Sequence, residues 1–230
     1  MADVAVQRVD FGYFVRPAEE TGTGAARAEP CLGYLVQHSE GLLLVDTGMG
    51  SDPEVDAYYQ PLRYQLEDAV AGAGATLDDI AYVVNCHLHF DHCGGNASLP
   101  GRPIFTQRVE LEIARREEGY TLPELVDAPG LTYEILDGEA EILQGVFVIP
   151  TPGHTAGHQS VAVRRADGTV VVAGQSHNTA AAYGSDVLGR QAVQEHRLTG
   201  AVPVPEWIDR LQQFDPARVV FAHDRAVWEP

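Results

Sequence analysis

Hydrophobic residues alternate with polar ones, or form short continuous runs, along most of this chain. Residues 4–15 alternate between apolar and other side chains, which predicts an opening strand. Apolar runs of strand length recur further on and are bounded by turn-forming residues. They predict strands over residues 32–37, 42–45, 80–84, 104–105, 131–136, 140–143, 146–149, 160–163, 170–173 and 219–222.

Helical spacing occurs between some of these runs. A proline followed by apolar residues at a helical period predicts a helix over residues 61–72. Helices are also expected over 185–197 and over 205–214, which opens with a proline. Residues 110–117 are charged and helical, and we interpret them as a surface helix whose charges need no functional explanation.

Two segments lack any apolar period and predict loops. Residues 119–130 are punctuated by glycine and proline, and residues 16–30 are rich in Gly, Ala, Pro and Glu. The second loop is expected to be mobile, and the sequence leaves open whether it caps a site. We find no close repeat and no linker, so a single domain over residues 1–230 is expected. The order of segments suggests two β-then-α halves that deliver their strand ends to one rim.

The charge of the chain limits its partners. The 230 residues carry a formal net charge of −18, which argues against nucleic acid or an anionic membrane as a partner. Every basic residue is arginine, which excludes lysine Schiff-base chemistry and a P-loop lysine. We expect a small-molecule substrate. The sequence leaves the oligomeric state open, with a homodimer as one arrangement.

Cysteine usage and apolar run lengths favour a cytoplasmic protein. Cys31, Cys86 and Cys93 form a small, odd set without a disulfide framework, which suits a reducing compartment. Residues 1–10 show no basic segment followed by an apolar one, so no signal peptide is expected. No run approaches the ~18 apolar residues that a membrane span requires.

The most informative stretch directly follows the apolar run 80–84. His87, His89 and His92 fall within six residues, together with Asp91, and two glycines follow. The glycines let the backbone turn sharply, so these side chains are expected in a loop at the end of a rigid strand. Metal-binding and catalytic side chains commonly occupy such a position.

Two more histidines lie at the ends of later strands. His154 follows the run 146–149 in a Gly- and Pro-rich loop, and His223 follows the run 219–222. Imidazole and carboxylate ligands suit zinc, with iron or manganese as candidates. Three protein ligands and an open position would indicate catalytic rather than structural metal. The two expected ligand sets are His87, His89 and His154 for one ion, and Asp91, His92 and His223 for a second.

The His-x-His-x-Asp-His spacing at 87–92 resembles the metal-binding motif of the metallo-β-lactamase superfamily. Asp-Thr-Gly at 46–48, Pro-Gly-His at 152–154 and the strand-end His223 extend this resemblance over nearly the whole chain. The resemblance implies an α+β fold, the αββα sandwich, in which two mixed sheets are flanked by helices. It also implies that the metals lie at one edge, between the sheets.

Within that superfamily, the motifs look most like those of the N-acyl-homoserine lactonase, or quorum-quenching, family. The resemblance implies attack of a metal-bound hydroxide on a lactone carbonyl, with Asp91 carrying the proton to the leaving alkoxide. Glyoxalase-II-type thioesterases share most of this framework, so another ester, a thioester, a β-lactam or a natural-product intermediate is an alternative substrate. A third reading is a metal-binding protein that kept the fold and has weakened or lost hydrolysis.

One departure from the family pattern concerns the metal count. The family normally places a metal-bridging aspartate where this chain has Gln175. A neutral amide supplies one weak oxygen ligand and no anion, so two dications would repel each other more strongly. Three arrangements remain: one ion at the first ligand set, two ions bridged with the help of Gln175, or His177 as a substitute ligand.

A second departure concerns substrate contacts. The family's substrate-holding tyrosine would fall at Asn178, whose amide could donate to the developing oxyanion instead. Tyr183 is nearby, but the sequence does not place it. Among the remaining residues, Asp46 is either a turn former or a carboxylate that orients a ligand histidine. His158 is expected to be a buried supporting histidine, and Cys93 a small buried residue.

Overall fold

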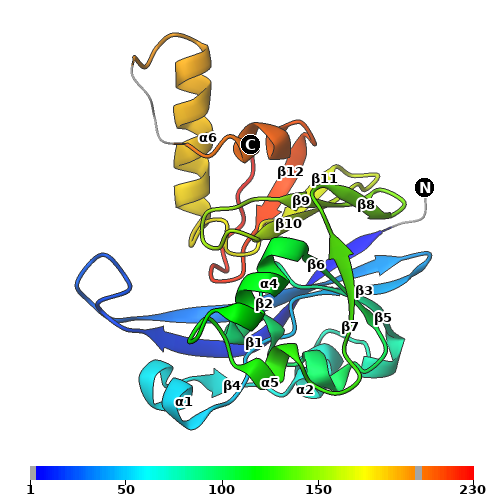
Figure 1. The fold of residues 1–230 in the computed structure, drawn as a ribbon. Helices are drawn as coiled ribbons and strands as arrows, with labels where there is room; N and C mark the ends of the chain where they lie inside the picture. The colour runs from blue at the N-terminus through cyan, green and yellow to red at the C-terminus, as the bar shows by residue number, and fades with distance from the viewer. Residues whose placement is uncertain (1–3, 200–203) are drawn as a thin grey trace.

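Two β-sheets packed face to face form the centre of the computed structural model, which describes residues 4–199 and 204–230 (Figure 1). The first sheet has seven strands and is mixed: β1, β2 and β3 pair antiparallel, whereas β3, β5, β6 and β7 pair parallel. Across this sheet the order is β4 (Leu62–Arg63), β1 (Ala5–Arg16), β2 (Arg27–His38), β3 (Gly41–Val45), β5 (Ile80–Val84), β6 (Pro103–Gln107) and β7 (Thr132–Leu136).

The second sheet has five strands. Its order is β12 (Pro216–Val220), β11 (Thr169–Val172), β10 (Gln159–Val163), β9 (Val146–Pro150) and β8 (Ala140–Leu143). Only β11 and β12 pair in parallel, and the other neighbours are antiparallel.

Alternation along each strand divides its side chains between two cores. In β3, Leu43 and Val45 join a buried cluster that contains residues of both sheets, while Leu44 joins a cluster with helix α2. In β10, Val161 belongs to the shared cluster, whereas Ala162 packs on the opposite face with residues of α6 and α7. Successive strand residues point to opposite faces, so apolar residues on both faces require cover on both sides.

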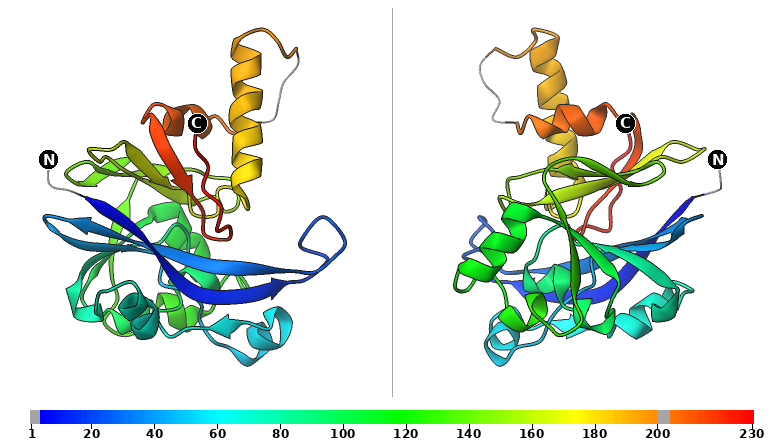
Figure 2. Two further views of the ribbon diagram at one scale, coloured as in Figure 1. Left: turned by 180° about the vertical axis from the view of Figure 1, so that it is seen from behind. Right: turned by 45° about the vertical axis from the view of Figure 1, so that its right-hand side comes forward.

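Helices supply that cover (Figure 1). Helix α2 (Leu66–Gly72) packs against the first sheet, and α6 (Ala180–Gln194) and α7 (Trp207–Gln212) pack against the second. Both views in Figure 2 show α6 standing on the side of the second sheet that faces away from the first. The αββα expectation is confirmed. The shorter helices are α1 (Pro53–Tyr59), α3 (Phe90–Cys93), α4 (Arg108–Arg116) and α5 (Pro123–Val126), and the 3-10 turns are η1 (Leu77–Asp79) and η2 (Asn96–Ser98).

Some element boundaries differ from the sequence expectation. The helix expected over 61–72 starts only at Leu66, because β4 first pairs with β1 and Tyr64 N donates to Phe11 O. The loop expected over 16–30 is confined to residues 17–26, since the flanking residues extend the β1–β2 hairpin. The segment 119–130 contains the short helix α5, and α1 was not anticipated. Among the described residues, no helix has the length and apolar character needed to cross a membrane.

Strand register brings the polar strand ends together at one edge. Val45 of β3 lies opposite Val84 of β5, so the residues that follow both strands are neighbours. Val172 of β11 likewise lies opposite Val220 of β12. A backbone hydrogen bond from Gln159 N to Cys86 O, 2.8 Å long, ties the two sheets together at this edge. The expected common rim is therefore present.

Candidate metal centre

The first expected ligand set converges in space. His87 and His89 leave the end of β5, and His154 comes from the loop after β9. His87 Nε2 lies 3.0 Å from His89 Nδ1, and His154 Nε2 lies 3.2 Å from the same atom. His87 is fully buried, whereas His154 is exposed, so the set runs from the interior to the surface.

The second set lies deeper in the same edge. Asp91 and His92 sit on the one-turn helix α3, and His223 follows β12. Asp91 Oδ2 lies 3.4 Å from both His92 Nε2 and His223 Nε2, which are themselves 3.3 Å apart. All three side chains are buried. Both ligand sets predicted from strand ends are therefore brought together.

Hydrogen bonds on the far side of two rings fix which nitrogen faces the centre. Asp46 Oδ2 accepts from His92 Nδ1 at 2.9 Å, and the carbonyl of Pro30 accepts from His223 Nδ1 at 2.9 Å. In the neutral form of each ring, which metal binding requires, Nε2 is thereby left facing Asp91 with its lone pair available. Asp46 therefore makes the contact expected of a carboxylate that orients a ligand histidine, which was one of the two roles that the sequence allowed.

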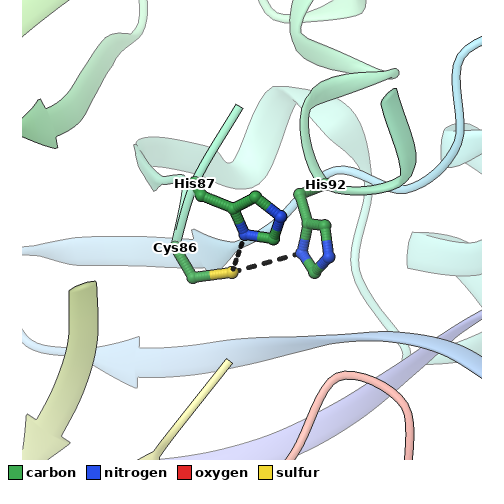
Figure 3. A group of neighbouring side chains, drawn as sticks. All are labelled: Cys86, His87 and His92. Carbon is green, nitrogen blue, oxygen red and sulfur yellow. Dashed lines mark hydrogen bonds between the residues drawn. The ribbon is translucent and has the colours of Figure 1, made fainter. Parts of the chain in front are cut away.

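Cys86 provides a sulfur atom between two ligand rings (Figure 3). Its Sγ lies 3.3 Å from His87 Nδ1 and 3.2 Å from His92 Nδ1, as the dashed lines show. The same thiol donates to Asp46 Oδ2 at 3.0 Å. One buried carboxylate therefore reaches a ring of each ligand set: His92 directly and His87 through the Cys86 sulfur.

Gln175 lies beside the second set and lines the same cavity as His89, Asp91 and His154, and its expected position between two ions stays a prediction. Its Oε1 lies 3.3 Å from His92 Nε2, and its backbone N–H donates to His158 Nε2 at 3.0 Å. His158 is fully buried and contacts Thr151 through Nδ1, so it supports Gln175 rather than joining either ligand set. Gly174 has a φ of 58°, and a Cβ there would lie 2.6 Å from Cys86 Cβ, so only glycine fits before Gln175.

His177 does not replace the missing acid. Its Nε2 lies 3.1 Å from Asp186 Oδ2, and its ring packs edge-on against Trp207 at a centroid distance of 5.6 Å. These contacts turn the side chain toward α6 and α7. Of the three arrangements considered for the metals, the one that uses His177 is therefore not supported by this geometry.

Asn178 and Tyr183 belong to neither ligand set, although Asn178 lines the same hollow as His223. The amide Nε2 of Gln175 donates to Asn178 Oδ1 at 3.5 Å, and Asn178 is an exposed residue that lines a neighbouring hollow together with Thr179. Its role as an oxyanion donor stays a prediction. Tyr183 is fully buried, and its hydroxyl accepts from Gln212 Nε2, so it contributes to the core beneath α6.

A cavity of about 510 Å³ opens onto both ligand sets. Phe14, Tyr59 and Phe90 form an aromatic wall, in which the rings of Tyr59 and Phe90 stack at 5.0 Å. Arg16 also lines the cavity, but Glu29 accepts its Nε–H at 2.7 Å, so its charge is compensated. The ligand-set residues that line the cavity, with Gln175, are His89, Asp91 and His154.

Burial holds the imidazoles of the first set neutral. It lowers the pKa of His87 well below the usual value, and nearby His92 and His89 lower it further. Burial is also the largest cause that lowers the pKa of His89 to about 4. His154 is exposed as a residue, but loss of water around its imidazole, followed by the charge of nearby His89, lowers its pKa to about 3. Neutral imidazole is the form that binds metal, because the coordinating lone pair is then free.

The second set is electrostatically different. Burial raises the pKa of Asp91, but the neighbouring His92 and His223 lower it by more, so this carboxyl stays ionised. Burial lowers the pKa of His92, yet Cys86, Asp91 and Asp46 raise it well above its usual range. A buried anion surrounded by imidazoles is a favourable environment for a cation.

The residues present fit a metal ion. The atoms of each set lie within 4.8 Å of one another, and the donor chemistry is imidazole nitrogen in one set and imidazole with carboxylate in the other. Such donors suit zinc and related divalent ions. The supporting contacts to Asp46, Pro30 and Cys86 complete the pattern expected around metal-binding histidines.

Sequence reasoning missed one buried carboxylate of this site. Glu110 lies in the first turn of α4, which was interpreted as a surface helix, and it is fully buried. Tyr120 was also missed: its ring lies 4.6 Å from that of His89, and it lines the cavity. The apolar spacing of Leu111 and Ala114 on α4 indicates a half-buried helix, but nothing in the local sequence marks Glu110 as an inward-facing residue.

Two sheets in an αββα arrangement, with a histidine- and aspartate-rich edge between them, define a metallo-hydrolase type of fold. Residues 26–223 match the metallo-beta-lactamase superfamily, and the chain belongs to this superfamily.

Among its relatives, an N-acyl homoserine lactonase of a Bacillus species is 37% identical over 148 residues, which cover 58% of each chain. An N-acyl homoserine lactonase of Rhizobium johnstonii is 29% identical over 90% of this chain and 86% of its own length.

Solved structures agree with this grouping. An N-acyl homoserine lactone hydrolase with the product N-hexanoyl-L-homoserine bound at its catalytic metal centre superposes with a TM-score of 0.77. The superposition covers 98% of this chain and 95% of that one, at 25% identity. The expected resemblance to the lactonases is therefore confirmed.

Proposed function

We propose that this protein is a metal-dependent hydrolase that opens the ring of N-acyl homoserine lactones. The observation that carries the proposal is the pair of converging ligand sets beside one cavity. The similarity to N-acyl homoserine lactonases over 90% of the chain supports the choice of substrate.

The chain's own residues have separate roles in this reaction. A bound metal would polarise the lactone carbonyl and supply hydroxide near neutral pH. His87, His89 and His154 would hold it as neutral ligands, and Asp91 faces the cavity as an ionised carboxylate. Hydrolysis adds one water across the acyl C–O bond. Asp91 would accept the water's proton and pass it to the ring oxygen that leaves.

The walls of the cavity favour a neutral substrate with an apolar tail. Phe14, Tyr59 and Phe90 present aromatic surface beside the ligand sets. Arg16 forms ion pairs with Glu29 and Glu20, so its charge is already compensated and is not available to bind an anionic substrate. This favours an acyl lactone over a glutathione-type thioester.

The direct test is incubation of metal-loaded protein with acyl-homoserine lactones of several chain lengths. Ring opening adds the mass of one water, which mass spectrometry detects. Asp91→Asn should lower turnover by about 10²–10⁴-fold, the usual contribution of a positioned acid or base. Absence of ring opening at every chain length would reject this substrate, and hydrolysis of a parallel thioester panel would then support the alternative.

We also propose zinc as the native metal, with the second ligand set binding more weakly than the first. Gln175 supplies a neutral oxygen 3.3 Å from His92 Nε2, where an anion would offset the repulsion between two dications. Elemental analysis of protein purified without added metal would identify the metal. A value near one zinc per chain would support the proposal, and two tightly bound ions would contradict it.

Cytoplasmic localisation and a homodimeric state stay predictions. Three buried free cysteines support a reducing compartment. Cell fractionation would test the first prediction, and light scattering of the purified protein would test the second.

A further inference from the structure

Glu110 is a buried carboxylate that the proposed reaction does not use. Its Oε1 accepts from the backbone N–H of Leu88 at 2.8 Å and from the hydroxyl of Tyr120. Its Oε2 accepts from the hydroxyl of Thr155 at 2.8 Å. The side chain is fully buried, so these three bonds replace the water that the carboxylate loses on folding.

Each of the three donors is adjacent to a ligand of the first set. Leu88 lies between His87 and His89 in the chain, and Thr155 directly follows His154. The ring of Tyr120 packs on that of His89, with centroids 4.6 Å apart. One carboxylate therefore contacts the loop after β5, the loop after β9 and the segment that covers His89.

The loop after β9 lies close to the first turn of α4. A Cβ on Gly157, in the loop that carries His154, would lie 2.4 Å from Glu110 Cβ. The first turn of α4 and this loop are thus in direct backbone contact. A displaced Glu110 would move the two loops relative to each other, and the distance of 3.2 Å between His154 Nε2 and His89 Nδ1 depends on that spacing.

The second ligand set is oriented by other groups. Asp46 fixes His92, and the carbonyl of Pro30 fixes His223. None of the three donors to Glu110 is a direct chain neighbour of these two histidines. The bonds to Glu110 therefore support the first set only, whereas Asp46 orients His92 directly and reaches His87 through Cys86.

We propose that Glu110 is a positioning residue for the His87–His89–His154 ligand set, because it joins the two loops that carry these ligands. The inference rests on the proposed metal centre. It predicts that loss of Glu110 weakens metal binding at the first set and leaves the second set unchanged.

The test separates the two sets by mutation. His223→Ala removes a ligand of the second set, and His154→Ala removes one of the first, so each background retains one complete set. Zinc affinity is then measured by competition with a chromophoric chelator, with and without Glu110→Ala. In the His223→Ala background we expect affinity to fall about 10–100-fold, the usual effect of removing a ligand's supporting contact. In the His154→Ala background we expect no change.

A matched control and a milder variant guard against effects on folding. Glu112→Ala removes an exposed carboxylate from the same helix and should leave both affinities unchanged. Thr155→Val keeps the shape of the side chain and removes only the bond to the His154 loop. If Glu110→Ala does not fold, Thr155→Val must still weaken the first set selectively.

Each outcome distinguishes the inference from the proposed function. If the unmodified protein binds no zinc, the proposed metal centre is wrong. If it binds zinc and Glu110→Ala weakens both backgrounds equally, or neither, Glu110 is a structural residue only and the inference is overturned. Equal affinities for Thr155→Val and the unmodified sequence would also count against it.

Discussion

The amide of Gln175 stands where two metal ions would benefit from a negative charge. Its Oε1 lies 3.3 Å from His92 Nε2, while its backbone N–H is fixed by His158. The backbone at this residue is therefore fixed in place. The missing negative charge results from the glutamine itself and not from a shift of the loop that would carry an acid elsewhere. The number of bound ions should respond to charge at this residue.

Restoring a carboxylate at Gln175 should strengthen the second metal site. Gln175→Glu keeps the reach of the side chain, and Gln175→Asp introduces the residue that the lactonase pattern places there. We expect zinc content to rise toward two ions per chain and the weaker affinity to increase about 10–100-fold. Elemental analysis and chelator competition are the measurements. Asn178→Asp adds the same charge nearby and should not reproduce the effect; if it does, general electrostatics rather than ligation is responsible.

The thiol of Cys86 should be replaceable by a hydroxyl but not by a methyl group. Cys86→Ser can still donate to Asp46 and accept from His87 Nδ1, so zinc affinity should change little. Cys86→Ala leaves His87 Nδ1 without this partner and should weaken the first site about 10-fold. Chelator competition measures both. Equal losses in the two variants would mean that sulfur size, not hydrogen bonding, sets the orientation.

The residues of the candidate site lie at the ends of strands and in the loops that follow them. The loop after β9 is a clear case, because it carries His154 and passes directly against α4 at Gly157. A side chain at Gly157 would overlap the backbone of Glu110, whereas one at Gly153, in the same loop, would meet nothing within 4 Å.

Gly157→Ala should therefore destabilise the protein, and Gly153→Ala should not. Overpacking of a buried contact costs about 1–3 kcal/mol, and relief would require α4 and the loop to separate. Urea unfolding monitored by circular dichroism gives the two free energies of unfolding. Gly153→Ala is the matched control within one loop. A Gly157→Ala protein as stable as the unmodified one would show that the loop can move away from α4 without cost.

Local sequence signals predicted most of the strands and the residues that converge at the candidate metal centre. They also offered Asp46 and His158 as supporting residues, but they missed Glu110. His87, His89 and His92 could be recognised because they lie close together after an apolar run. His154 and His223 could be added because they also follow strands. The supporting contacts join distant residues: Asp46 reaches His92 across 46 positions, and Glu110 reaches Thr155 across 45. A local pattern can mark a candidate residue, as it did for Asp46, but it does not encode the partner that the residue contacts.

The start of α2 was placed too early because a contact between distant residues decides it, as for the supporting contacts. Apolar spacing over residues 61–72 fits a helix, but Leu62 and Arg63 find partners in β1. Tertiary pairing outweighs helical preference in this short segment, since helix formation is weak over so few residues. The buried inward position of Glu110 was hidden for a related reason, because a charged helix usually faces solvent.

Over the whole molecule, each ligand set takes side chains from both halves of the sandwich. His87 and His89 follow β5 of the first sheet, while His154 follows β9 of the second. Asp91 and His92 are likewise completed by His223 from beyond β12. A bound ion would therefore link the two sheets, and its binding free energy would add to the stability of the sandwich.

This arrangement has a kinetic consequence for folding. His92 and His223 are 131 positions apart, and neither ligand set is complete until the two sheets have docked. An ion that recognises only the docked state stabilises the native protein without assisting the earlier collapse. Zinc should then slow unfolding and leave the folding rate unchanged.

Stopped-flow unfolding and refolding in urea, with and without free zinc, would measure this. At a free zinc concentration of 100 times the dissociation constant, the added stability is about 2.7 kcal/mol, so unfolding should slow by about 100-fold. Chelated protein provides the reference for both rates. Faster refolding in zinc would instead indicate that a ligand set forms before the sheets meet. Slower unfolding with unchanged refolding would mean that the metal binds only after the sheets have docked, and that the lifetime of the folded chain depends on the supply of zinc.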